Sequence, residues 1–87
     1  MKTLLTYDVS GRHKEVKDYL IARGYQKIYK ESTRTFNLPN TTLWKNGIQP
    51  SEAIVDIKAA ASNQSVKLER AFAVDFNNVD GILGDTN

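Results

Sequence analysis

The chain of 87 residues contains no cysteine and only one histidine. The absence of cysteine excludes a disulfide framework, a zinc site built from thiolates and a cysteine nucleophile. No stretch approaches the about 20 consecutive apolar residues that a membrane-spanning helix needs. The first residues reach Asp8 before they could form the apolar segment of about 7–15 residues that a secretory signal peptide requires. We therefore expect a cytoplasmic protein without a membrane association.

Charge of one sign is also not in large excess. The chain has 12 Lys and Arg against 10 Asp and Glu, which leaves a net charge of +2. So small a surplus does not by itself indicate a nucleic-acid-binding protein, and a basic surface would have to come from clustering. Apolar residues make up 40% and charged residues 25%, as in globular proteins. We expect one domain over residues 1–78, followed by a flexible or loosely docked tail over 79–87.

Six segments have the periodicity of a strand or a helix. Alternation of apolar and polar residues, with many β-branched and aromatic side chains, predicts strands over Thr3–Val9, Tyr25–Phe36, Thr41–Trp44 and Lys67–Phe76. Apolar residues at a spacing of three and four predict helices over Arg12–Arg23 and over 50–62. In the last strand, the alternation predicts one face with Leu68, Phe72, Val74 and Phe76, and another with Ala71 and Ala73.

Turn and cap residues separate these segments. Ser10 is expected to cap the first helix, and Gly24 to close it in a left-handed conformation. Pro50 suits the first position of the second helix, where its missing N–H costs nothing. The segment Leu38–Asn40 is expected to connect the second and third strands as a hairpin.

The order strand, helix, strand, strand, helix, strand predicts an α+β fold of the ferredoxin-like split βαβ type (βαββαβ). In this fold a four-stranded antiparallel sheet carries both helices on one face. The other face is left for solvent, a ligand or a second copy of the chain.

One acidic residue occupies a position suited to chemistry. Asp8 stands at the carboxyl end of the first predicted strand, directly before a turn, and Arg12, His13 and Lys14 follow it. A carboxylate is a hard ligand suited to Mg²⁺, and a helix N-terminus favours phosphate. The alternative is that Asp8 only caps the helix or turns the chain.

Short motifs add a family resemblance. The sequence Thr6-Tyr7-Asp8-Val9-Ser10 near the start of the chain resembles the CRISPR-associated protein 2 family, and Glu31-Ser32-Thr33 in the second predicted strand resembles its SinR-like relatives. The virulence-associated protein D toxins, which are ribonucleases, share that superfamily fold. The resemblance implies a ferredoxin-like homodimer that is associated with nucleic acid. It also implies a Mg²⁺-dependent endonuclease, a DNase or an RNase, with Asp8 as the metal-associated acid, Tyr7 beside it and Ser10 in the turn.

The single histidine, His13, is a further catalytic candidate, because imidazole is the side chain best suited to proton transfer at neutral pH. The alternative is an ordinary solvated side chain on the first turn of the helix. Clustered basic residues on the first helix and second strand are the candidate nucleic-acid contacts: Arg12, Lys14, Lys17, Lys27, Lys30 and Arg34.

Aromatic residues are interleaved with these basic residues. On an open sheet, Tyr29, Phe36 and Trp44 would suit stacking against unpaired bases. Alternatively, Tyr29 and Trp44 fill the core or a dimer interface.

A second carboxylate is not expected near Asp8 in the same chain. In an antiparallel pair, Asp75 near the end of the last strand lies opposite the start of the first strand. A symmetric homodimer would instead supply a second Asp8. Three functions therefore stay open: phosphodiester hydrolysis at the dimer axis, a non-catalytic dimeric binding or scaffold module, and a toxin-type ribonuclease of a toxin–antitoxin pair.

Overall fold

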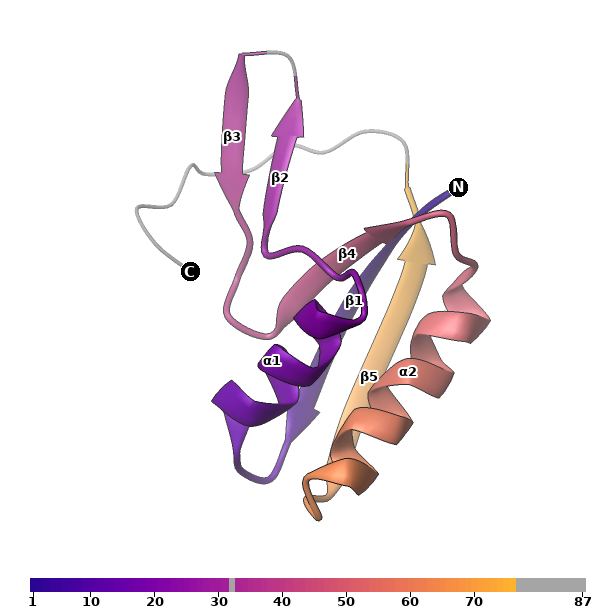
Figure 1. Ribbon diagram of the computed structural model, residues 1–87. Coiled ribbons are helices and arrows are strands. Elements are labelled where there is room, and N and C mark those ends of the chain that lie inside the picture. Colours follow the sequence, from indigo (N-terminus) through magenta and orange to yellow (C-terminus); the bar gives the residue numbers. More distant parts are fainter. Residues whose placement is uncertain (32, 77–87) are drawn as a thin grey trace.

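The structure, a computed structural model, describes residues 1–31 and 33–76. Its two helices and five strands follow in the order β1 (Lys2–Val9), α1 (His13–Ala22), β2 (Ile28–Glu31), β3 (Arg34–Asn37), β4 (Thr42–Asn46), α2 (Pro50–Asn63) and β5 (Leu68–Asp75) (Figure 1). The predicted α+β class is confirmed. The predicted tail over 79–87 lies outside the described residues. Neither helix in the described part of the chain is long and apolar enough to cross a membrane.

The sheet differs from the predicted four-stranded one. Strand β1 is central in a three-stranded antiparallel sheet of order β4-β1-β5, and β2 pairs with β3 in a separate sheet. A single bridge joins Gln26 to Trp44 at the position expected for a fourth strand, with N···O distances of 2.8 and 3.0 Å. The segment around Gln26 pairs with β4 at this bridge alone, and the following residues, Ile28–Glu31, pair with β3 instead.

The hairpin turn lies elsewhere than predicted. The expected strand Tyr25–Phe36 is divided, and the turn lies between Glu31 and Arg34, while the segment Leu38–Asn40 instead links β3 to β4. The sequence over 31–34 contains neither Gly nor Pro, so it carries no strong turn signal. Figure 1 shows β2 and β3 as a hairpin of their own beside the three-stranded sheet.

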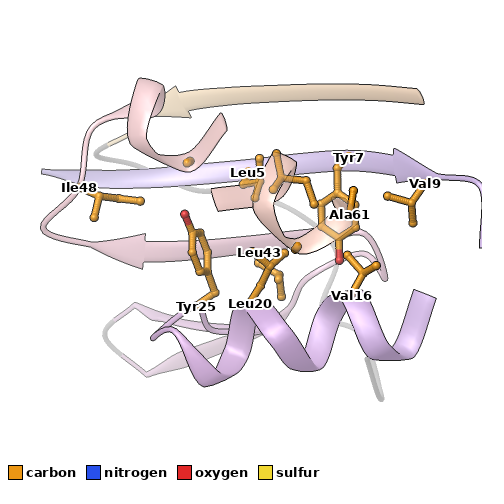
Figure 2. Packing of buried hydrophobic residues seen from close by; sticks show 12 residues of the cluster. Leu5, Tyr7, Val9, Val16, Leu20, Tyr25, Leu43, Ile48 and Ala61 are labelled. Carbon is orange, nitrogen blue, oxygen red and sulfur yellow. The ribbon is translucent and has the colours of Figure 1, made fainter. Parts of the chain in front are cut away.

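The main core lies between the sheet and both helices. Alternate residues of β1 are buried, and they pack with side chains of α1 and α2 in one cluster (Figure 2). Both helices therefore cover the same face of the sheet. The members of this cluster are Leu5, Tyr7, Val9, Val16, Leu20, Tyr25, Leu43, Ile48, Ala53, Ile57, Ala60 and Ala61.

A second, smaller core lies on the opposite face of the sheet, which we call the outer face. Tyr29, Phe36 and Leu38 are buried there against Leu4, Trp44 and Phe76. The ring centroid of Tyr29 lies 5.1 Å from that of Trp44 and 5.3 Å from that of Phe76. Both pairs have the edge-to-face geometry that stabilises aromatic contacts. The Trp44 indole N–H donates to the Ile28 carbonyl at 2.8 Å. Tyr29 and Trp44 are therefore core residues, and the hairpin covers part of the outer face.

Of three predictions about the ends of the helices, the structure confirms those for Gly24 and Pro50 and contradicts the one for Ser10. Gly24 has a φ of +100° and donates to Ile21, and Tyr25 donates to Leu20, so the first helix closes as predicted. The second helix begins at Pro50, as predicted. Ser10 does not cap α1, because its Oγ accepts a hydrogen bond from the Lys67 backbone N–H at 2.9 Å. Ser10 instead ties the turn after β1 to the residue before β5.

Candidate functional site

Asp8 lies on the outer face, where it forms an ion pair with Arg70 of β5. The guanidinium places Nη2 at 2.6 Å and Nε at 2.8 Å from the same carboxylate oxygen, Oδ2. The Asp8 side chain is 43% exposed and that of Arg70 is 83% exposed. Asp8 is therefore neither a helix cap nor an isolated carboxylate, but one partner of a cross-strand ion pair.

A bulge in β5 lies directly beyond this pair in the ladder. Asp8 lies opposite Arg70, but the next residue, Val9, lies opposite Leu68, so Glu69 is an extra residue in the ladder. The prediction that Leu68 shares a face with Phe72 was wrong, because the bulge turns Leu68 toward the helices. Sequence reasoning also missed Arg70. Asp75 pairs with Thr3, and five residues further along the antiparallel ladder this register places Arg70 opposite Asp8.

An open hollow of about 380 Å³ surrounds the ion pair, and we call it the outer hollow. It is lined by Thr6, Tyr7, Asp8, Arg70, Ala71 and Phe72. Phe72 lies opposite Thr6 in the ladder and is 64% exposed. The part of the outer face that the hairpin leaves uncovered therefore combines an ion pair with an exposed aromatic ring.

The four predicted catalytic residues do not come together. The Tyr7 side chain points into the main core and is only 3% exposed (Figure 2), and burial raises its pKa to about 12. Its hydroxyl therefore does not lie beside the Asp8 carboxylate. Ser10 is engaged with Lys67, and His13 lines a different hollow on α1.

Among the described residues of one chain, those around Asp8 do not form a magnesium centre. A hard cation needs a set of oxygen ligands, whereas the Asp8 carboxylate already binds a guanidinium. Within residues 1–31 and 33–76, no three His, Cys, Asp or Glu residues gather as a metal site would need. Asp75 lies opposite Thr3 at the other end of β1, as expected from the antiparallel order. Within the described residues, no second carboxylate lies beside Asp8, so the Mg²⁺ site stays a prediction that involves a second copy of the chain.

A second hollow, of about 420 Å³, gathers several of the predicted nucleic-acid contacts, and we call it the basic groove. Helix α1 contributes most of its wall. Lys27, directly before β2, and Asn40, in the loop before β4, complete it. The lining residues are His13, Lys14, Lys17, Asp18, Ile21, Lys27 and Asn40. Lys27 thus lies beside Lys14 and Lys17 of α1, although it comes from a different segment of the chain.

The charges in the basic groove affect one another. Lys17 donates to the Asn40 side-chain oxygen at 3.2 Å, and partial burial together with the nearby Lys27 charge lowers the pKa of Lys17. Lys14 forms an ion pair with Asp18 at 2.7 Å, and this hydrogen bond raises the pKa of Lys14. An anion in the groove would therefore meet lysines whose mutual repulsion it relieves.

The other three predicted contacts lie outside the basic groove. Arg12 donates to the side chain of Gln64 at 3.1 Å. Arg34 lies over the Phe36 ring, 5.0 Å from its centroid, and forms an ion pair with Glu31. Lys30 is exposed on the hairpin. Among the described residues, the six predicted basic residues therefore divide into one clustered group and three separate positions.

Comparisons with protein-family models, with curated proteins and with solved structures returned no match to this chain. The resemblance to the CRISPR-associated protein 2 superfamily therefore stays a prediction from short motifs. The geometry of the basic groove and of the Asp8–Arg70 pair is the basis on which a function can be proposed.

Proposed function

We propose that the chain is a nucleic-acid-binding protein that contacts phosphate groups through the basic groove. The observation that carries this proposal is that Lys14 and Lys17 of α1 and Lys27, which precedes β2, line one hollow. Clustered lysines supply the sequence-independent part of nucleic-acid affinity by neutralising phosphates and releasing counterions. Because the net charge is only +2, this local clustering matters more than the overall charge.

The proposal includes a ferredoxin-like arrangement and a homodimer. The bridge between Gln26 and Trp44 supports the arrangement, since it is the beginning of the expected fourth strand at the free edge of β4. The exposed Phe72 on the outer face supports a symmetric contact between two copies. The basic groove and the outer hollow share no residue, so such a dimer leaves the groove accessible.

A binding role is favoured over a hydrolytic one by the surroundings of Asp8. Its carboxylate is paired with Arg70, and the carboxylate of Asp75 belongs to the other end of the ladder. Neither the Tyr7 hydroxyl nor the Ser10 hydroxyl is directed to the same place. We therefore propose the non-catalytic binding module as the first function.

Hydrolysis of phosphodiester bonds is the second candidate, either as an endonuclease at a dimer axis or as a toxin-type ribonuclease. The observation that favours it is that the Asp8 carboxylate is 43% exposed on the outer face, where a symmetric copy could bring a second carboxylate. Single- and double-stranded DNA and RNA would be incubated with the natural chain and with Asp8→Ala, each with and without Mg²⁺. Cleavage that needs both Mg²⁺ and Asp8 would establish this candidate over the binding module.

Titration of labelled single- and double-stranded DNA and RNA tests the binding proposal. For duplex DNA, log K should fall with log salt by about 0.9 for each phosphate neutralised, so affinity should drop steeply between about 50 and 200 mM salt. Lys17→Met and Lys27→Met should lower the affinity for nucleic acids of every sequence alike and make this slope shallower. Lys58→Met, on the exposed side of α2, removes the same charge outside the groove and should change little. Undetectable binding of all four nucleic acids at low salt would refute the proposal.

A further inference from the structure

Two further hollows continue the basic groove along the surface. One of about 260 Å³, which we call the middle hollow, shares Ile21 and Lys27 with the basic groove. Another of about 340 Å³, the hairpin hollow, shares Gln26 and Ile28 with the middle hollow. Both are lined by the segment that leads from the end of α1 into β2 (Figure 1). The three hollows therefore form one continuous track, which begins at the first turn of α1 and ends at the hairpin.

The chemical character of the lining changes along this track. The basic groove at one end holds the lysines of α1 and Lys27. The middle hollow has an apolar wall from Ile21, which is 38% exposed, and Ile28. The hairpin hollow at the other end is lined by Lys30, which is exposed. The track thus has cations at both ends and an apolar stretch between them.

An aromatic side chain lines the hairpin hollow beside Lys30. Trp44 is half-buried there, and its indole N–H already donates to the Ile28 carbonyl at 2.8 Å. What Trp44 offers the hollow is therefore ring surface rather than a hydrogen-bond donor. Aromatic rings stack on the bases of single strands, and this contact tolerates any sequence because every base has a π-face. A nucleotide in the hairpin hollow would meet a ring for its base and a cation for its phosphate.

This order of groups matches an unpaired strand better than a duplex. The bases of a single strand can be splayed out between its phosphates, where they contact apolar and aromatic side chains. A duplex stacks its bases inside and presents phosphates and sugars, which would leave the apolar stretch uncovered. Lys14 is paired with Asp18, and Lys17 with Asn40, so the lysines of the basic groove alone give no preference among nucleic acids. Selectivity depends on the two hollows that follow.

We propose that the track binds single-stranded nucleic acid in preference to duplex. Phosphates lie at the basic groove and at Lys30, and bases lie against Ile21 and Trp44. This inference rests on the proposed nucleic-acid-binding function and names its substrate class. An unpaired strand is also flexible enough to follow the track, whereas duplex DNA is stiff over about 50 nm.

The test compares ligands that carry the same number of phosphates per strand. The full-length natural chain is titrated, at one salt concentration, with a single strand as DNA and as RNA, with the corresponding DNA duplex, and with an abasic DNA strand that lacks the bases. Contacts that only an unpaired base can make should tighten binding of the base-bearing single strand about tenfold or more relative to the duplex and the abasic strand.

The fluorescence of Trp44 gives a second readout without any substitution. Trp44 is the only tryptophan of the chain, so its emission reports on the hairpin hollow alone. Stacking of a base should quench this emission when the single strand binds. The duplex and the abasic strand should leave it nearly unchanged, because neither places a free base against the ring.

Variants locate the preference in the track. Ile21→Ala and Lys30→Met should each reduce the advantage of the single strand several-fold. Val55→Ala and Lys58→Met are the matched controls, since both residues are exposed on α2, and they should keep the full advantage. All four residues are exposed, so the variants are expected to fold.

Equal affinity for single strand, duplex and abasic strand, together with the steep salt dependence, would overturn the preference and leave nucleic-acid binding at the basic groove in place. Trp44 emission that stays unchanged when the single strand saturates the protein would also overturn the track, because its far end would be empty. Absence of binding to every ligand would refute the binding function and this inference together.

Discussion

The Arg70 guanidinium lies across the β1–β5 ladder from the Asp8 carboxylate, with Nη2 at 2.6 Å and Nε at 2.8 Å from one oxygen. This pair occupies the position where the sequence motif suggests a metal-associated acid. The pair continues the regular register that begins at Thr3 and Asp75, and the bulge at Glu69 follows it, since Val9 lies opposite Leu68 rather than Glu69. The chemistry available to Asp8 is thus set by a residue 62 positions away in the sequence.

The Asp8–Arg70 pair should contribute little to stability, because both side chains are partly exposed. A double-mutant cycle with Asp8→Asn and Arg70→Gln should give a coupling energy of about 0.2–1 kcal/mol, measured by urea unfolding. Asp75→Asn on the same strand as Arg70 is the control, and it should show no coupling with Arg70→Gln. A coupling well above this range would mean that the pair is shielded from water, as a contact with a second copy would produce.

Exposed Phe72 should report on the proposed homodimer. Sedimentation at micromolar concentration should give twice the chain mass of 9.8 kDa, and Phe72→Glu should reduce it to one chain because a carboxylate would be buried in the contact. Val55→Glu is a matched control, since Val55 is 65% exposed on α2, away from the outer face. A single-chain mass for the natural protein at high concentration would contradict the dimer, and with it the shared Asp8 site.

Gly24 should resist substitution at the end of α1. Its φ of +100° is a conformation that other residues adopt at a cost of about 1–2 kcal/mol, and an added Cβ would lie 3.2 Å from Cε of Lys45. We expect Gly24→Ala to lower the free energy of unfolding by at least that amount. Gly11→Ala should be nearly neutral, because a Cβ there meets nothing within 4 Å. Equal stability of the two variants in chemical denaturation would show that the left-handed turn is not needed.

Buried Tyr7 should make the fold sensitive to alkali. Burial raises its pKa from 10.0 to about 12, so between these values the unfolded chain loses the proton while the folded chain keeps it. The contribution of Tyr7 to the free energy of unfolding is fully present below pH 10. As the pH rises further, this contribution declines by about 1.4 kcal/mol per pH unit until the folded tyrosine also ionises. Tyr7→Phe should flatten the decline in urea-unfolding free energy above pH 10. An unchanged decline in this variant would rule out Tyr7 as its cause.

Tyr25, like Tyr7, should make the free energy of unfolding decline at alkaline pH. Burial is the main cause that raises its pKa, and its hydroxyl also donates to Asp56 at 2.8 Å. Tyr25→Phe should therefore also flatten the alkaline decline, at the cost of the hydrogen bond to α2 at neutral pH. Comparing the two variants at pH 7 and above pH 10 separates the loss of that bond from the loss of the titration.

The sequence by itself determined the features that depend on neighbouring residues. The alternation in Thr3–Val9 predicted a strand there, because successive residues of a strand point to opposite faces. Gly24 and Pro50 predicted where α1 ends and where α2 begins, because each residue has backbone preferences that act within one turn. The basic residues of the groove could also be identified, since their charge does not depend on the fold.

Only the tertiary structure decided which of these residues meet. The hairpin turn after Glu31 has no Gly or Pro signal, and it forms because pairing Tyr29 with Phe36 builds a second core against Trp44. The bulge at Glu69 likewise depends on the register between two strands at opposite ends of the described chain. The pairing of Asp8 with Arg70 and the meeting of Lys17 with Lys27 follow from packing between distant segments. Local periodicity carries no information about such register, because each element satisfies its own pattern wherever its partner lies.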